Sequence, residues 1–431
     1  MKLQHECIEN ALGALAKDRP AAPALQAPGR KPLTYADLAA QIHRVRKYLG
    51  GLDIGRGDIV AGVIPSRPEM AVACATLPAS STFAPLSPSL TPDDYSQLVV
   101  RMGAKAILAP KGEEHPVRAA ARRHGVAEID VAVEPDAPVG LFTLDLGRAG
   151  DSLRNPTPAR PQLAYVLVSS GTTGRPKLIP AEHRQALRYA NVAGEWLEYS
   201  PRDVGCHLMP MHLGNGLRSG WLNPLLNGVS TVCLPEVDVD AFFAALEQYR
   251  PTCLNAGFTL LSAILRRVPD YRPAVAQSRL RFLRAGLGRL DPDEIERLEQ
   301  AFDAPLLVGF SSTETTSIAH DPLPPRPRKR GTAGLPLGNE VAIMDSSGAI
   351  AGACAEGEIV VRGPLVFGGY LDDPQLTAES FVGDWFRTGD LGHIDEDGYI
   401  HLSGRIKEII NRGGEKISPV EIDPRFGLCQ A

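Results

Sequence analysis

The spacing of apolar residues along the first third of the chain predicts alternating helices and strands. Apolar positions recur at helical spacing in segments 8–15 and 38–49, and segments 68–78 and 91–102 also favour helix. Between them lie short apolar runs typical of buried strands, at 59–64, 82–86 and 106–109. Such alternation implies parallel strands covered by helices, which is an α/β fold.

Local signals place the ends of one of these helices. Thr34 is followed three residues later by Asp37, which predicts an N-cap with an acidic first turn. Gly50 and Gly51 end the same helix.

The alternation of predicted helices and strands resumes after residue 160 and is followed by a different sequence pattern. Strands are expected at 163–168, 204–209 and 229–234, and helices at 186–197, 240–249 and 259–267. From about residue 340 the chain has short strand-like runs separated by glycines, at 341–344, 358–362 and 399–402. This part predicts a small β-rich unit that follows the α/β region.

Composition narrows the class of protein. The chain has 431 residues, 44% of them hydrophobic, and a net charge of −5. This is a globular composition, and its acidity argues against a dedicated nucleic-acid binder. There is no run of 18 apolar residues and no apolar signal segment, so no membrane span is expected. The seven cysteines form no CxxC pair, which disfavours a disulfide framework and a structural zinc site and fits the cytoplasm.

The most informative segment follows the expected strand 163–168 and is expected to precede a helix. It reads Ser-Ser-Gly-Thr-Thr-Gly-Arg-Pro-Lys over residues 169–177. Its two glycines allow close backbone approach, its hydroxyls and free N–H groups suit phosphate oxygens, and Lys177 adds a cation. It is not a Walker motif, because no Gly-Lys-Ser/Thr ends it. An ordinary polar turn would not require this set of groups, which comprises Ser169, Ser170, Gly171, Thr172, Thr173, Gly174 and Lys177.

Residues 169–177 resemble the phosphate loop of the adenylate-forming superfamily, which includes acyl-CoA synthetases, luciferases and nonribosomal adenylation domains. The resemblance runs from about Leu33 to Glu421 and includes Ala-Pro-Leu-Ser-Pro at 84–88. It implies a large N-terminal domain over 1–404, with two α/β subdomains and a small β-barrel-like unit. Residues 405–431 would then be a hinge and the remnant of a C-terminal domain.

The resemblance also implies a nucleotide and metal site. Phe-Ser-Ser-Thr-Glu at 310–314 matches a family motif in which the aromatic ring stacks on adenine. Ser312 and Thr313 would contact the nucleotide, Thr313 at the α-phosphate, and Glu314 would help to hold Mg²⁺, which accepts few protein ligands. Phe310 replaces the usual Tyr, and Ser311 stands where many members have Gly.

Two further segments extend this site towards the C-terminus. Thr-Gly-Asp at 388–390 resembles the family motif whose aspartate accepts hydrogen bonds from the ribose hydroxyls, here Asp390. Arg405 would reach the ribose or phosphate, and Lys407 falls at the hinge pivot. Residues 410–421 resemble the loop that lines the pantetheine tunnel.

The acyl pocket is less clearly marked. Segment 209–217 resembles a family pocket motif, but His212 lies one position early, so a structural histidine is an equal alternative. The small-residue loop at Gly286 and Leu287, and the wall segment containing Gly257, complete the implied pocket. Arg218 is a candidate for pairing a second carboxylate, although a surface position is the expectation. Segment 209–217 lacks the aspartate with which adenylation domains hold the α-amino group of an amino acid. We therefore expect the substrate to be an aliphatic or aryl carboxylic acid.

The implied reaction has two halves. A carboxylate attacks the α-phosphorus of ATP and expels pyrophosphate, and a thiol of CoA or of a carrier-protein pantetheine then attacks the acyl-AMP. Lys177, Thr313 and Glu314, with Mg²⁺, would neutralise charge in the first half.

The end of the chain raises alternatives. Family members carry a second lysine far beyond the hinge, whereas this chain ends 24 residues after Lys407. Residues 424–431 also depart from the family pattern. We therefore expect a truncated, frameshifted or naturally short protein. Besides an active ligase, the sequence leaves open a binding module without turnover, a ligase that loads a carrier protein, and a partner that supplies a C-terminal domain.

Overall fold

The chain forms two compact units. The computed structural model describes residues 5–64, 68–154, 160, 162–169, 175–235, 238–286, 292–352, 354–408, 410–412 and 415–417. Unit 1 comprises Met1–Leu306 and Phe367–Asp373, and unit 2 comprises Leu307–Val366 and Pro374–Ala431. The expected division at residues 404 and 405 stays a prediction.

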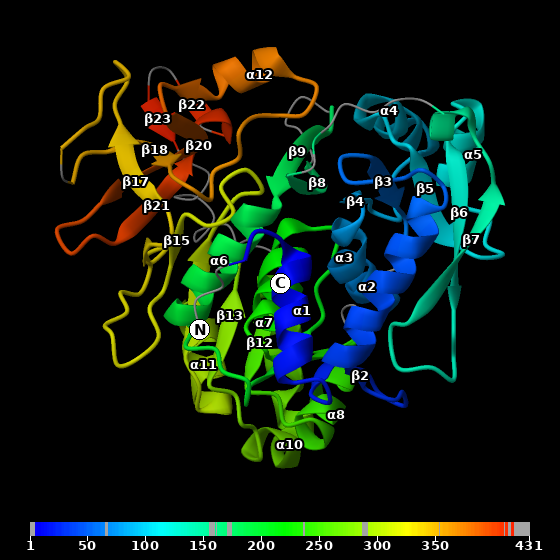
Figure 1. Cartoon of the computed structure of the whole chain (residues 1–431). Helices are drawn as coiled ribbons and strands as arrows, with labels where there is room; N and C mark the ends of the chain where they lie inside the picture. The colour runs from blue at the N-terminus through cyan, green and yellow to red at the C-terminus, as the bar shows by residue number, and fades with distance from the viewer. Residues whose placement is uncertain are drawn as a thin grey trace. The chain divides into compact units, whose positions relative to one another are not determined.

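The first sheet of unit 1 is mainly parallel, as the alternation predicted (Figure 1). Strands β3, β4, β5, β6 and β8 run parallel, and β7 and β9 add antiparallel edges. In sheet order the strands are β7 (Phe142–Arg148), β6 (Ala127–Val133), β5 (Ala106–Pro110), β3 (Ile59–Gly62), β4 (Thr82–Pro85), β8 (Leu163–Ser169) and β9 (Lys177–Glu182).

Short-range hydrogen bonds begin two helices of this half where the sequence predicted. Thr34 Oγ1 accepts the Asp37 N–H at 3.1 Å, and Asp37 Oδ2 accepts the Thr34 N–H at 3.0 Å. Thr91 and Asp94 form the same reciprocal pair. Each pair satisfies backbone donors that a helix start leaves unpaired. The helices of this half are α2 (Tyr35–Gly50), α3 (Pro68–Thr76), η1 (Leu77–Ala79), α4 (Pro92–Met102), α5 (Pro116–Arg123) and η2 (Asp151–Arg154).

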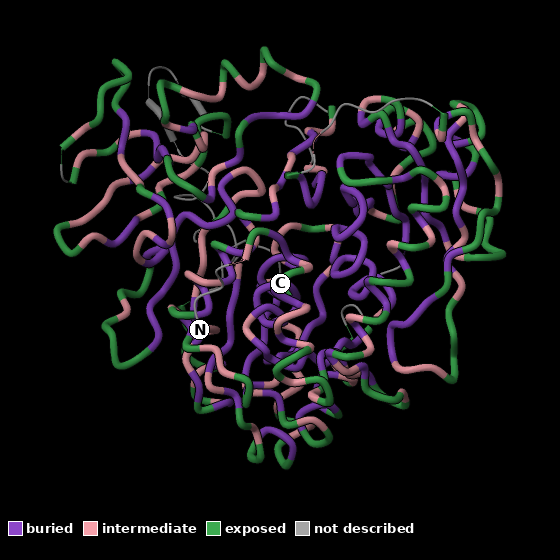
Figure 2. Tube along the Cα trace, viewed as in Figure 1, coloured by how far each residue is buried: buried purple, intermediate pink, exposed green. Residues whose placement is uncertain are grey.

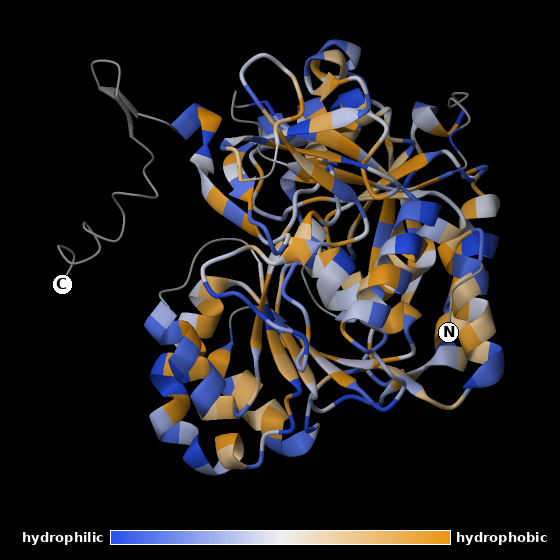
Figure 3. Ribbon diagram, turned by 90° about the vertical axis from the view of Figure 1, so that its left-hand side faces the viewer, coloured by the Kyte–Doolittle hydropathy of each residue, from blue (hydrophilic) through white to orange (hydrophobic). Residues whose placement is uncertain are grey.

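The core of this half lies between the sheet and helices α4 and α5. Ile107 and Val166 from the strands pack with Leu98 and Val117 from these helices. The strands are largely buried, as Figure 2 shows in purple. Helices at the surface of unit 1 mix apolar and hydrophilic residues (Figure 3). Removal of the apolar faces from water is the main stabilising contribution here.

The second sheet of unit 1 repeats the parallel arrangement. Strands β1, β10, β11, β12 and β13 are parallel, and β2 is antiparallel to β1. Within unit 1 the order is β13 (Phe282–Ala285), β12 (Cys253–Ala256), β10 (Val204–His207), β11 (Ser230–Cys233), β1 (Pro23–Gln26) and β2 (Leu33–Thr34).

Helices of this second half include a π-helix, η3, next to the sheet. The indole N–H of Trp221 in η3 donates to the Ala71 carbonyl in α3 at 2.8 Å, which joins the two halves of unit 1. The bounds are α1 (Ile8–Asp18), α6 (His183–Trp196), η3 (Asn215–Leu222), α7 (Asn223–Leu226), α8 (Val239–Gln248), α9 (Phe258–Arg267), η4 (Val268–Tyr271), α10 (Arg272–Ala276) and α11 (Pro292–Phe302).

Unit 2 is built mainly from antiparallel strands. Unit 2 begins at Leu307, earlier than the start near residue 340 that the glycine-rich pattern predicted, because Ile318 and Ala333 share one core with Ile343 and Ile359. Its elements are β14 (Leu306–Phe310), β15 (Ala319–His320), β16 (Leu335–Pro336), β17 (Glu340–Met344), β18 (Gly357–Arg362), α12 (Pro374–Glu379), β19 (Phe381–Val382), β20 (Trp385–Ile394), β21 (Ile400–Arg405), η5 (Ile406–Glu408), β22 (Ile410–Arg412) and β23 (Glu415–Ile417).

The structure bears on two expectations from the sequence, one about membrane-spanning helices and one about the cysteines. Among the described residues, no helix combines the length and apolar character that a membrane crossing requires. The cysteines in the described part of the chain are free thiols, at Cys7, Cys74, Cys206, Cys233, Cys253 and Cys354.

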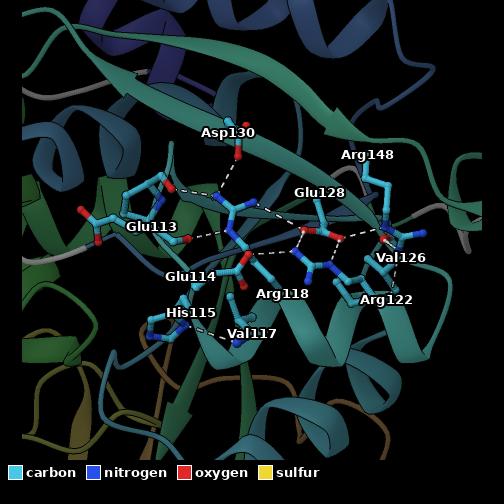
Figure 4. A network of polar contacts seen from close by, with 12 residues as sticks. Glu113, Glu114, His115, Val117, Arg118, Arg122, Val126, Glu128, Asp130 and Arg148 are labelled. Carbon is cyan, nitrogen blue, oxygen red and sulfur yellow. Dashed lines mark hydrogen bonds and ion pairs between the residues drawn. The ribbon is translucent and has the colours of Figure 1, made fainter.

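A buried carboxylate organises the charges beside β6 (Figure 4). Glu128, with 3% of its side chain exposed, accepts from Arg148 Nε at 2.8 Å and Arg122 Nε at 3.1 Å. Arg118 lies 3.5 Å from it and also donates to Asp130 at 2.7 Å. Burial raises the pKa of Glu128, but the hydrogen bonds from Arg148 and Arg122 outweigh it and leave that pKa lowered.

We expect Glu128→Ala to lower the free energy of unfolding by about 3 kcal/mol, because it leaves arginines without their shared carboxylate. Urea denaturation measures this loss. The matched control is Asp145→Ala, since Asp145 pairs with Lys111 where both side chains are more than half exposed. That change should alter stability by less than about 1 kcal/mol. Equal losses in the two variants would contradict the role given to Glu128.

Candidate active site

The ends of the predicted phosphate loop are joined by a β-ladder. Ser169 ends β8 and is the cross-strand partner of Lys177, which begins β9. The structure thereby corrects the expectation that a helix follows the loop directly: the antiparallel strand β9 intervenes, and helix α6 begins at His183. The pattern of apolar residues did not predict β9, because Lys177–Glu182 is short and its strand conformation depends on pairing with β8. Loop residues Ser170, Gly171, Thr172, Thr173 and Gly174 lie outside the described residues.

Positive charge gathers at the far end of this loop. Lys177 Nζ donates to the Tyr370 hydroxyl at 3.1 Å and lies 4.9 Å from the centre of its ring. Arg101 Nη1 donates to the Pro176 carbonyl at 2.7 Å. Burial lowers the pKa of Arg101, and the nearby Arg175 lowers it further. Clustered cations of this kind suit a polyphosphate.

The predicted acyl-pocket glycines lie on neighbouring strands of the second sheet. Gly257 follows β12 and Gly286 follows β13, and Ala256 pairs with Ala285 in the parallel register between them. A Cβ on Gly257 would lie 3.8 Å from the Met209 side chain, which follows β10. Carboxyl ends of adjacent parallel strands form the usual ligand edge of an α/β sheet. His212 is half-buried in the turn that leads from this edge to η3. Leu287 lies outside the described residues.

Arg218 contradicts its expected surface position. It is only 8% exposed and belongs to η3, the π-helix packed against β10 and β12. The sequence could not show this, since a single arginine within a helix has no periodic signal for burial. A buried arginine is uncommon, so Arg218 stays a candidate for ligand binding beside its expected structural role.

In unit 2, the segment expected to bind adenine and metal forms a tight turn. Phe310 ends β14, is half-buried and packs against the core of this unit. Ser312 and Thr315 bond each other reciprocally, with Thr315 N–H donating to Ser312 Oγ at 3.1 Å. Thr313 and Glu314 lie in this turn, half-buried. A hydroxyl and a carboxylate side by side are hard oxygen donors that fit Mg²⁺ next to phosphate.

Asp390 lies on β20 opposite Arg405 on β21, so the structure brings these two predicted residues together. Arg405 Nε donates to Asp390 Oδ1 at 2.9 Å. The Asp390 side chain is 13% exposed, and burial raises its pKa although Arg405 opposes that shift. Lys407, the predicted hinge, lies in η5 directly after β21.

Sequence reasoning missed Glu358, which holds the backbone before Asp390. Its carboxylate accepts the Gly389 N–H at 3.0 Å and Arg387 Nε at 2.8 Å, and Glu358 is 7% exposed. Gly389 has φ 76°, a conformation that favours glycine. Thr388 Oγ1 donates to the Ile359 carbonyl and accepts the Asp390 N–H. The signal in the sequence is weak, because Glu358 lies 32 positions before Asp390.

Comparisons with known proteins agree across nearly the whole chain. The AMP-binding enzyme family matches residues 13–371. An oxalate–CoA ligase of Arabidopsis thaliana is 33% identical over 98% of this chain and 83% of its own length. An indoleacetate–CoA ligase of Aromatoleum aromaticum is 31% identical over 92% of this chain and 78% of its own. The crystal structure of ATP-bound MatB from Rhodopseudomonas palustris has a TM-score of 0.85 and 25% identity, and the match covers 98% of this chain and 83% of that one.

We expect Glu358→Ala to loosen the turn at Gly389 by removing the acceptor of its N–H. Amide hydrogen exchange at Gly389 should become at least tenfold faster, about 1.4 kcal/mol less protection. The control is Glu356→Ala, because Glu356 is exposed and bonds His393 and Ser403 instead. Unchanged exchange at Gly389 in the Glu358 variant would contradict this arrangement.

Proposed function

Because the chain belongs to the AMP-binding enzyme family, we propose that it converts a carboxylic acid to an acyl-AMP with ATP and then to a thioester with CoA. The observation that carries this proposal is the likeness to a named CoA ligase over 98% of the chain. The placement of charged groups in each unit is consistent with it. An AMP-forming acid–thiol ligase is therefore the activity to be tested.

In the first half-reaction, charge must be neutralised around the α-phosphorus of ATP. We assign Lys177, held by Tyr370, to the phosphate oxygens, with Ser169 and the loop after it as hydrogen-bond donors. Thr313 acts on the α-phosphate, and Glu314 holds Mg²⁺, which would withdraw charge from the phosphates. Preformed positive charge of this kind stabilises the transition state without reorganisation.

In unit 2, Asp390 is assigned to the ribose hydroxyls, and Arg405 to the ribose or phosphate. A carboxylate accepts from two hydroxyl groups at once, which fixes orientation as well as affinity. Phe310 is assigned to the adenine face, with Ser312 beside it, and Lys407 to the hinge. In unit 1, the acyl group is assigned to Gly286, Leu287, Gly257 and His212. Gly257 and Gly286 follow two neighbouring parallel strands at one edge of the sheet, and His212 lies in the turn that leads from that edge to η3.

CoA is the proposed acceptor, since the relatives above are named CoA ligases. A carrier-protein pantetheine is the alternative thiol, and a partner that supplies a C-terminal domain is a further proposal. The names of the relatives do not identify the acid substrate of this chain. One relative is named for oxalate, which has two carboxylates, and one for the aromatic indoleacetate.

We expect Asp390→Ala and Glu314→Ala to weaken binding of a non-hydrolysable acyl-AMP mimic or of Mg-ATP at least tenfold, about 1.4 kcal/mol, because each removes a charged partner. Isothermal titration calorimetry measures this. Asp397→Ala and Glu340→Ala are the controls, as both carboxylates are exposed and form surface ion pairs, Asp397 with Lys329 and Glu340 with Arg362. Wild-type affinity in both test variants would refute the assignments.

Pyrophosphate exchange that depends on an added carboxylate tests turnover. We expect exchange in the wild-type chain and a loss of about 100-fold in Lys177→Met, because the cation at the phosphates is removed. Lys329→Met is the control, since Lys329 pairs with Asp395 at the surface of unit 2. Nucleotide binding without exchange would instead favour a binding module. Thioester formation with CoA or with a holo-carrier protein then identifies the acceptor.

A further inference from the structure

A segment from far along the sequence packs beside Lys177. Residues 367–373 belong to unit 1, although the chain up to Val366 and from Pro374 belongs to unit 2. Leu371 of this segment is 7% exposed and shares one core with Leu178 of β9 and Leu98 of α4. The segment is therefore part of the half of unit 1 that carries the phosphate loop.

The main chain on both sides of Lys177 is anchored from outside its own strand. The Pro176 carbonyl, directly before it, accepts from Arg101 Nη1 of α4 at 2.7 Å. The Leu178 carbonyl, directly after it, accepts the Leu371 N–H at 2.9 Å. These two hydrogen bonds add to the β8–β9 ladder and fix the point from which the lysine side chain extends.

Tyr370 holds the other end of that side chain. Its ring is 7% exposed and packs edge-on against Phe367, with ring centres 4.8 Å apart. A phenylalanine would make the same ring contact without bringing a hydroxyl into the interior, where a polar group needs a partner. Here Lys177 Nζ donates to that hydroxyl at 3.1 Å and lies 4.9 Å from the ring centre. The hydroxyl and the ring together restrict where the ammonium lies.

Arg101 occupies a place that disfavours a cation. Its side chain is 11% exposed, and its Nε lies 3.9 Å from Asp372 Oδ2. Burial lowers the pKa of Arg101, Arg175 lowers it further, and Asp372 opposes these shifts only in part. An apolar side chain would fill this place at a lower desolvation cost. The hydrogen bond to Pro176, beside Lys177, is the contact that an apolar residue could not make.

A fixed ammonium has an advantage at a phosphate site. A free lysine side chain has many rotamers, and holding it in one of them costs conformational entropy when the ligand binds. A fold that has already restricted the side chain removes this cost from binding and from the transition state. Groups that restrain Lys177 therefore affect phosphate affinity without contacting a phosphate.

We propose that Tyr370 and Arg101 are positioning residues that direct the Lys177 ammonium to the phosphates of the bound nucleotide. Tyr370 acts through the lysine side chain, and Arg101 acts through the carbonyl of Pro176. This inference rests on the proposed function, because it takes from it the assignment of Lys177 to the phosphate oxygens.

The test compares two ligands that differ in their phosphates. Mg²⁺ with α,β-methylene-ATP, which cannot release pyrophosphate, and adenosine, which has no phosphate, are titrated calorimetrically into the full chain. We expect Tyr370→Phe to raise the Kd of the ATP analogue about tenfold and to change that of adenosine by less than about twofold. An unchanged Kd for the analogue, or an equal loss for adenosine, overturns the inference.

A double-mutant cycle separates positioning from a merely structural role. In a Lys177→Met background, Tyr370→Phe should change the Kd of the ATP analogue by less than about twofold, because the hydroxyl acts through the ammonium. A further loss of about tenfold in that background overturns the role of Tyr370. A hydroxyl needed for stability alone would lower the melting temperature in both backgrounds and leave the affinity of the folded chain unchanged, which also overturns it.

Arg101→Met is the second variant and keeps the test decisive if Tyr370→Phe folds poorly. We expect it to weaken binding of the ATP analogue about fivefold, again without effect on adenosine. In the Lys177→Met background this effect should disappear. A loss that persists there means that Arg101 acts on the phosphates itself, and it overturns the positioning role, as does wild-type affinity in the single variant.

Tyr399→Phe is the matched control. Tyr399 lies in unit 2, donates its hydroxyl to the Pro327 carbonyl and has Lys329 Nζ 5.8 Å from its ring centre. It thus combines a bonded hydroxyl and a nearby ammonium outside the phosphate loop. It should leave the affinity for both ligands unchanged; a loss equal to that of Tyr370→Phe would overturn the inference.

Pyrophosphate exchange with an added carboxylate separates this inference from the proposed function. In an active chain, Tyr370→Phe should lower kcat for exchange about tenfold and leave the KM of the carboxylate unchanged. Coupled loss of nucleotide binding in a chain without exchange supports the positioning role and overturns the ligase activity. Exchange that Tyr370→Phe does not alter, with unaltered nucleotide affinity, supports the ligase and overturns the positioning role.

Discussion

The parallel register of β10, β12 and β13 is the constraint on which the acyl half of unit 1 depends. Because parallel strands point the same way, their carboxyl ends meet at one edge, and Gly257 and Gly286 lie there together. The same register aligns His207, Asn255 and Arg284 one layer below. A shift of one residue in any of these strands would move its polar side chain to the other face of the sheet.

Unit 1 contains two kinds of buried polar group, and the contrast between them is informative. Around Glu128, arginines and backbone carbonyls satisfy one another, so the charges stabilise the edge of the first sheet. Among the described residues, by contrast, the side chains of His207 and Asn255 meet no hydrogen-bond partner, although both are almost fully buried. The Glu128 cluster thus contributes to the stability of the first sheet, because its buried charge is matched by hydrogen bonds.

In unit 2, pairing between antiparallel strands positions the candidate nucleotide-binding residues. The ladder between β20 and β21 sets Asp390 opposite Arg405, and the Glu358 carboxylate on β18 holds the preceding glycine. Because Glu358 is buried and also bonds Arg387, it restrains the turn from the side of the core. The orientation of Asp390 is therefore a property of three strands rather than of the Thr-Gly-Asp segment alone.

The sequence by itself determined the α/β alternation, the capped start at Thr34, the helix that begins near Thr91, and the family to which 169–177 pointed, because periodicity, caps and motifs are local along the chain. Only the tertiary structure decided that β9 follows the loop, that Arg218 is buried, and that Glu358 supports Asp390. It also decided that His207, Asn255 and Arg284 lie on one face of the second sheet. These features depend on pairing between strands distant in sequence, and no local pattern records which residues such pairing brings together.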